Sequence, residues 1–221
     1  MPKIQAALAA LLLFFCGGAQ AAIILKADLT HSQETVQGIF QTSAGDPRPQ
    51  SFGNAVFIIN DAQTSMSFTA TIFNIDLTGT QTADSFDNLV AAHIHAAAPP
   101  GANGPVRWGF FGAPDNDNAP DDLVVTPFVD AVGGIISSKW DLTEGNGGTT
   151  LTDQLPNIFQ GLSYINFHTV QFGGGEIRGQ ILLAVPEPAT LTLLLCAGLG
   201  LAVLKRASVL GYYASAQPTR K

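Results

Sequence analysis

The chain has 221 residues, of which 46% are hydrophobic and 12% are charged, and its formal net charge is −7 at pH 7. Acidic residues concentrate between positions 22 and 186, where sixteen Asp and Glu outnumber five Lys and Arg to give a net charge of −11. So acidic a segment argues against nucleic acid and anionic lipid headgroups as partners, and favours cations or simple solubility.

Residues 1–21 read MPKIQAALAALLLFFCGGAQA and have the three parts of a secretory signal peptide. Lys3 gives the positive start, residues 6–15 form an uninterrupted apolar run, and the triplet AQA fits the small-x-small rule for cleavage. A lipoprotein anchor at Cys16 is the alternative, although two bulky phenylalanines precede it where small residues are expected. We therefore expect export through the secretion translocon.

Residues 22–185 are expected to form one all-β domain. Short segments rich in Val, Ile, Phe and Thr are punctuated by Gly, Pro, Asn and Asp, and residues 65–75 show the period-two alternation of a half-buried strand. Eight or nine such strands predict a Greek-key sandwich or barrel. The predicted strands are 22–29, 55–61, 65–75, 89–96, 105–111, 122–129, 134–140, 162–169 and 175–183. Only 151–160 reads as helical, limited by Pro156 to about one turn and capped by Thr152 or Asp153.

The chain has two cysteines, and both Cys16 and Cys196 lie in its apolar ends. The β domain therefore has no thiol, and no disulfide can hold it together although an exported protein could contain one. Its stability must come from core burial, with a bound ion as a further candidate contribution.

Two histidines, His93 and His95, stand at positions i and i+2 of a predicted strand, so both imidazoles leave the same face. Together with His168 they could bind a transition metal such as zinc or copper. If 162–169 and 176–183 form a hairpin, Glu176 lies near His168 and could orient its imidazole or bind the ion itself, while Arg178 could neutralise Glu176 instead. The alternative is that these side chains are ordinary polar residues on the solvated side of a sheet.

Two sequence blocks, AAHIHAAAPPGANGPV and LSYINFHTVQFGGGEIRGQI, resemble the CHRD domain, a module first named in chordin and common in exported bacterial proteins. The resemblance covers about residues 24–184 and implies an extracellular β module, with no reaction assigned to the family. The matching positions are His93, His95, Gly101, Gly104, Pro105, Val106, Tyr164, Asn166, His168, Thr169, Gly174, Gly175, Glu176, Arg178 and Gly179.

The end of the chain, VPEPATLTLLLCAGLGLAVLKR, resembles the PEP-CTERM sorting signal of Gram-negative bacteria. Its box is Pro186, Glu187 and Pro188, and its basic stop is Lys205 and Arg206. The apolar residues 189–204 between them would span about 24 Å as a transmembrane helix. The resemblance implies an exosortase-type processing enzyme as a partner. The tail 207–221 departs from the pattern, because such signals normally end just after the basic residues.

These features divide the chain into a signal peptide (1–21), a CHRD-like β domain (22–185), a sorting signal (186–206) and a short tail (207–221). We expect a membrane-anchored, then cell-surface or extracellular, module with a structural or adhesive role in a biofilm, with exopolysaccharide as a candidate partner. A metal-binding domain is the first alternative. Catalytic motifs are not found in the β domain, and an enzyme is the weaker reading. The chain also resembles copper/zinc superoxide dismutase more loosely. Because only His31 is left as a further imidazole, a dismutase site would be incomplete.

Overall fold

The computed structural model describes residues 22–116, 120 and 122–184, and confirms the all-β class. Each of the nine predicted strand segments contains a strand, and the last contains two. The elements are β1 (Ile23–Thr30), η1 (His31–Gln33), β2 (Phe52–Ile59), β3 (Ser65–Phe73), β4 (Leu89–Ala96), β5 (Val106–Phe111), β6 (Val124–Pro127), β7 (Gly133–Asp141), α2 (Leu151–Phe159), β8 (Ser163–Thr169), β9 (Ile177–Gln180) and β10 (Leu182–Leu183).

The predicted signal peptide, sorting signal and C-terminal tail all lie outside the described residues. Among the residues that the structure does describe, no helix is both long and apolar enough to cross a membrane.

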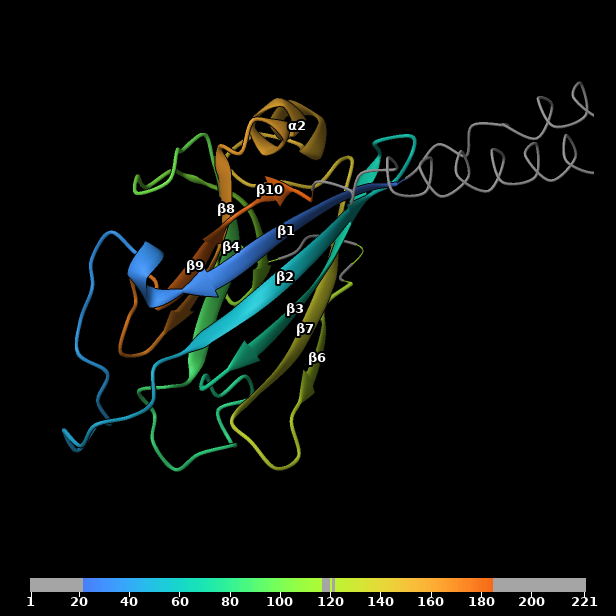
Figure 1. Cartoon of the computed structure of the whole chain (residues 1–221). Coiled ribbons are helices and arrows are strands. Elements are labelled where there is room, and N and C mark those ends of the chain that lie inside the picture. Colours follow the sequence, from blue (N-terminus) through green and yellow to red (C-terminus); the bar gives the residue numbers. More distant parts are fainter. Residues whose placement is uncertain (1–21, 117–119, 121, 185–221) are drawn as a thin grey trace, which may run out of the picture. The chain divides into compact units, whose positions relative to one another are not determined.

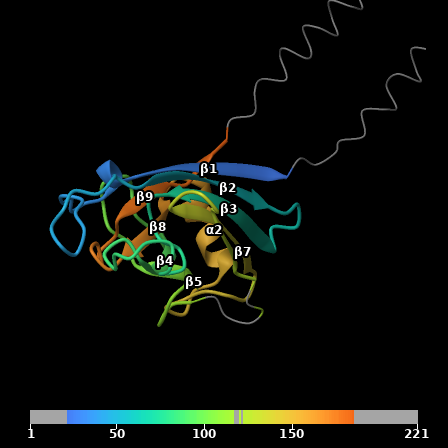
Figure 2. The same ribbon diagram turned by 90° about the horizontal axis from the view of Figure 1, so that it is seen from below.

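The strands form a single antiparallel sheet in the order β5-β4-β8-β9-β1-β2-β3-β7-β6, with β10 also paired to β1 (Figure 1). The sheet curls so that β1, β2 and β3 lie in one layer while β4, β5 and β8 lie in another (Figure 2). Trp108 of β5 stacks on Trp140 of β7 at 5.4 Å between ring centroids, although these strands lie near opposite ends of the sheet. The described strands thus make an open, sandwich-like curl.

The curl turns where β9 and β10 run beside β1. Thr30 pairs with Arg178, and Leu25 pairs with Leu183, so β9 and β10 follow one register along β1 with a break at Ile181. A Cβ at Gly179 would lie 2.5 Å from the backbone oxygen of Asp28, so this close approach of the two strands requires glycine.

Period-two alternation places the core between the two layers. In β1, Leu25, Ala27 and Leu29 are buried while the residues between them face outward, and β2 and β3 alternate in the same way. Because large aliphatic and aromatic side chains from both layers meet here, burial of their apolar surface holds the curled sheet closed.

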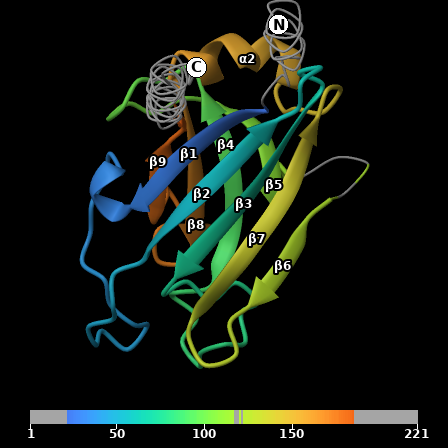
Figure 3. The same cartoon turned by 45° about the vertical axis from the view of Figure 1, so that its right-hand side comes forward.

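The helix α2 is longer than predicted and begins at a different cap. Thr150 is the N-cap: its hydroxyl accepts from the backbone N–H of Asp153, and the Asp153 carboxylate accepts from the Thr150 N–H, a capping box. Pro156 lies inside the nine-residue helix. The buried Leu151, Leu155 and Ile158 pack against the core, and this packing outweighs the one backbone hydrogen bond that proline removes. In Figure 3, α2 lies across one end of the sheet.

The outer face of β4, β8 and β9 is covered rather than solvated. Every residue of β8 is buried, and so are the last five residues of β4. Loops supply the cover: Ala98, after β4, donates its N–H to the Leu162 oxygen, and the backbone oxygens of Gly104 and Gly173 reach two imidazoles of this face. The histidines therefore do not stand on the wet side of a sheet.

Candidate metal centre

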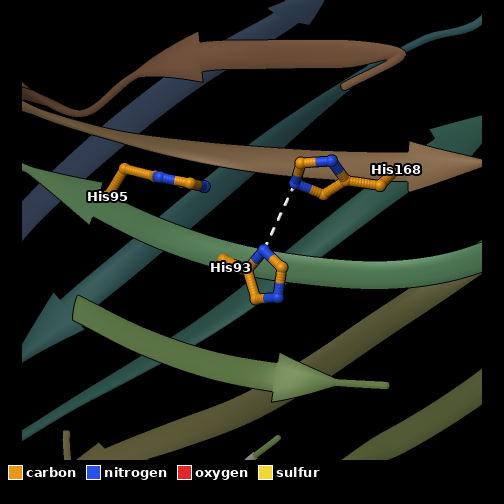
Figure 4. Close-up of side chains that lie close together, drawn as sticks. All are labelled: His93, His95 and His168. Atoms are coloured by element: carbon orange, nitrogen blue, oxygen red, sulfur yellow. Dashed lines mark hydrogen bonds between the residues drawn. The ribbon is translucent and has the colours of Figure 1, made fainter. Parts of the chain in front are cut away.

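Neighbouring strands bring the three predicted histidines together. His93 and His95 project from the same face of β4, and His168 projects from β8, which pairs with β4 through Ala91 opposite His168 and His93 opposite Asn166. The three side chains gather on this face in Figure 4. The three imidazoles lie together because the antiparallel register of β8 on β4 sets His168 beside the H-x-H pair.

The ring nitrogens lie at distances that suit a shared ion. His93 Nδ1 is 3.2 Å from His168 Nε2, and one nitrogen from each of the three imidazoles lies within 4.8 Å of the others. Two nitrogens bound at about 2.1 Å to a tetrahedral zinc ion would be about 3.4 Å apart. The pair of His93 and His168 already has this spacing, and His95 lies within reach of it.

Backbone carbonyls hold two of the rings. The Gly104 oxygen lies 2.9 Å from His95 Nδ1, and the Gly173 oxygen lies 3.1 Å from His168 Nδ1. A carbonyl only accepts, so both Nδ1 atoms carry the proton and both Nε2 atoms keep a lone pair. Such carbonyl contacts fix the tautomer of metal-binding histidines in many proteins.

One lone pair of the cluster has no partner. Each of the three histidines is only 8% exposed, and the buried His95 Nε2 makes no hydrogen bond. Leaving a buried polar atom unsatisfied costs about 1–3 kcal/mol, so native proteins rarely do so without a reason. A metal ion bound to the lone pair of this nitrogen would remove the penalty.

The electrostatics keep the imidazoles neutral. Burial lowers the pKa of His93 to about 3, helped by His168 and His95, and lowers the pKa of His95 to about 4 against the opposing effect of the Gly104 carbonyl. Burial also lowers the pKa of His168. At neutral pH all three rings are therefore uncharged, which is the form that binds a metal.

Glu176 lies in a different environment from the one expected. The Arg48 guanidinium donates to its two carboxylate oxygens at 3.0 and 2.6 Å, and the hydroxyls of Ser51 and Thr169 donate to them as well. This carboxylate, which is fully buried, therefore joins the loop before β2 to the β8–β9 hairpin instead of orienting the His168 imidazole.

Arg178 lies over an aromatic ring that stacks on His95, and it pairs with Glu34 instead of Glu176. Its guanidinium carbon lies 4.7 Å from the centre of the Tyr164 ring, whose other neighbour, His95, stacks on it at 4.7 Å and 3°. Its closest carboxylate is Glu34, at 3.6 Å. Burial raises the pKa of Glu34 to about 7, against the opposing charge of Arg178.

Several of these contacts were not predicted. Gly104 and Gly173 contribute backbone oxygens, which no side-chain pattern reveals, and Glu34 and Arg48 come from the long connection between β1 and β2. The fourth histidine stays outside the cluster: His31 Nδ1 donates to the backbone oxygen of Glu176, and His31 Nε2 accepts from the Gly38 N–H.

Comparison with known proteins gives a family for the β domain. No curated protein and no solved structure matches the chain. A family model, the CHRD domain, matches residues 25–181, a stretch that begins in β1, ends just after β9 and contains all three histidines of the cluster. Since this match covers most of the sequence, the chain belongs to the CHRD domain family.

Proposed function

We propose that this protein is an exported, non-enzymatic β module that binds one transition-metal ion, zinc or copper, through His93, His95 and His168. The observation that carries the proposal is the buried, unpartnered Nε2 of His95 within 4.8 Å of ligand atoms on two other neutral imidazoles. Three imidazoles in one cluster suit zinc and copper better than calcium or magnesium, which prefer oxygen ligands.

The ion would serve the structure by linking two strands. His93 and His95 belong to β4 and His168 belongs to β8, so coordination would add cross-strand bonds to the antiparallel pairing. The net charge of −11 over residues 22–186 favours the approach of a cation. Because the three imidazoles are buried, a substrate would have little access to the ion, which supports a structural role.

Metal analysis of the purified protein tests this proposal. We expect about one zinc or copper ion per chain by plasma mass spectrometry, and loss of that ion in the double variant His93→Ala/His95→Ala. His31→Gln is the matched control, since it removes a histidine outside the cluster and should keep the ion. A wild-type protein that stays metal-free after incubation with both ions, with an unchanged melting temperature, would contradict the proposal.

The sequence supports a second part of the proposal, which concerns export. The signal peptide would carry the β domain through the translocon, and the apolar residues 189–204 would hold it in the inner membrane while Lys205 and Arg206 stay cytoplasmic. An exosortase-type enzyme would then recognise Pro186, Glu187 and Pro188. The released domain would take a structural or adhesive role at the cell surface, in contact with exopolysaccharide.

Cell fractionation tests the sorting step. Changing Pro186, Glu187 and Pro188 to alanine should trap the protein in the inner membrane, whereas alanine substitutions of three polar residues in the tail 207–221 should not. Release of the triple variant at the normal rate would show that the Pro-Glu-Pro box has no part in sorting.

A further inference from the structure

A hollow beside the metal cluster has no role in the proposed ion site. It has a volume of about 440 Å³ and lies between η1, the loop after β4 and strand β9. Figure 1 shows η1 close to the strand β9 that forms one side of it. Six of its eight lining residues have hydrogen-bonding side chains, namely Ser32, Gln33, Glu34, Thr35, Arg178 and Gln180.

Two buried charged groups in this hollow have unused hydrogen-bonding atoms. Arg178 donates through Nε to the backbone oxygen of Gln33. Its Nη1 donates to the Ala102 backbone oxygen and to Asn103 Oδ1, but its Nη2 is buried without a partner. Glu34 Oε1 is also buried without a partner. Both side chains are only 3% exposed, and Arg178 Nε lies 3.6 Å from Glu34 Oε2, so a buried acid–guanidinium pair with unused hydrogen-bonding capacity lines the hollow.

The charges restrict the ligand to a neutral molecule. Where Glu34 is ionised, its charge offsets the guanidinium of Arg178, so an anion would gain little from the arginine and would be repelled by the acid. The strongly acidic domain disfavours anions further. Among the lining residues only Pro100 offers an apolar side chain, which disfavours a hydrophobic ligand.

A hydroxyl group both donates and accepts, so adjacent hydroxyls would satisfy the acid and the arginine together. A second hollow, of about 270 Å³, shares Glu34 and Thr35 with the first and adds the Phe172 ring and Asn103. It offers room for a neighbouring unit of the same ligand, with Phe172 among its lining residues.

We infer that the pocket around Glu34 and Arg178 binds a neutral polyhydroxylated ligand, a sugar unit of an extracellular polysaccharide. This inference rests on the proposed extracellular role and gives it a binding site. The Asn103 side chain and the Ala102 oxygen that hold Arg178 belong to the same loop as Gly104, which contacts His95. The pocket and the ion site are therefore neighbours built from different side chains.

Binding of the full-length protein to an array of immobilised neutral and uronic-acid oligosaccharides tests this inference, with calorimetry on the best neutral hit. We expect binding to neutral glycans, weakened about tenfold or more in Glu34→Gln, which keeps the shape but removes the charged acceptor. Ser32→Trp should block the hollow from an exposed position, and Ser67→Trp, exposed on β3, is the matched control that should bind like wild type.

Three outcomes would overturn the inference: no binding to any neutral glycan, binding only to uronic acids, or neutral-glycan binding that Glu34→Gln and Ser32→Trp leave unchanged. Metal content measured on the same samples separates this inference from the proposed ion site. Ser32→Trp should retain the ion, so loss of sugar binding with full metal occupancy would assign the two roles to different sites.

Discussion

Replacing Arg48 by methionine breaks its buried ion pair with Glu176 and should severely destabilise the fold. In Arg48→Met the Glu176 carboxylate keeps the Ser51 and Thr169 hydroxyls but loses both guanidinium bonds, at 3.0 and 2.6 Å. The side chains are 6% and 0% exposed, so water cannot replace the arginine. Breaking such a pair costs about 3–5 kcal/mol.

Urea unfolding followed by tryptophan fluorescence gives the free energy of unfolding, because Trp108 and Trp140 are fully buried. The control is the double variant Arg48→Met/Glu176→Gln, which replaces the stranded carboxylate by a neutral amide and should recover about 1–2 kcal/mol. Methionine keeps apolar contact with Phe40 and Phe172, so lost packing contributes little.

A loss below about 1 kcal/mol in Arg48→Met would refute the reasoning, since that is the range of exposed ion pairs. Metal content adds a second readout. Glu176 contacts no histidine ring of the cluster among its hydrogen bonds, so Arg48→Met should keep the ion as long as it stays folded. Loss of the metal ion from the folded variant would indicate that Glu176 does orient the His168 imidazole.

Three further changes test other parts of the fold. The pKa of Glu34 is raised to about 7 by burial, so its stabilising contribution is complete below about pH 4.5 and is lost as pH rises through 7. Melting curves should therefore show Glu34→Gln gaining on wild type between pH 5 and 8, and a pH-independent difference would contradict this sign. Trp108→Ala should cost about 3–5 kcal/mol of unfolding free energy by emptying the space between the two layers; a cost near that of a surface substitution would contradict the packing. Thr150→Ala should cost about 1 kcal/mol in the same urea assay by removing the capping box of α2, whereas Thr64→Ala, in an exposed turn, should cost less.

The strands were predictable because alternation is local. Residues 65–75 alternate between apolar and polar side chains, and the structure places β3 at Ser65–Phe73 with the same alternation of burial. The H-x-H pair was predictable for the same reason, because its i and i+2 spacing is local. His168 joins it only through the long-range pairing of β8 with β4.

The partners of these residues were not predictable from local pattern. Glu176 comes before β9 begins and directly after Gly175, whose φ is +128°, so the hairpin argument that placed it near His168 does not fix where its side chain points. Glu34 and Arg48 lie in the connection between β1 and β2, which has no strand periodicity and combines η1 and local turns with long-range contacts. Pro156 misled the prediction of α2, because packing outweighed intrinsic helix propensity.

Anomalous diffraction from crystals of the protein grown with zinc tests the central claim most directly. We expect one strong peak about 2.1 Å from a ring nitrogen of His93, His95 and His168, at full or nearly full occupancy. Data collected above and below the zinc absorption edge would identify the ion. An empty cluster at saturating zinc, with His95 Nε2 still unpartnered or bound only to water, would contradict the account.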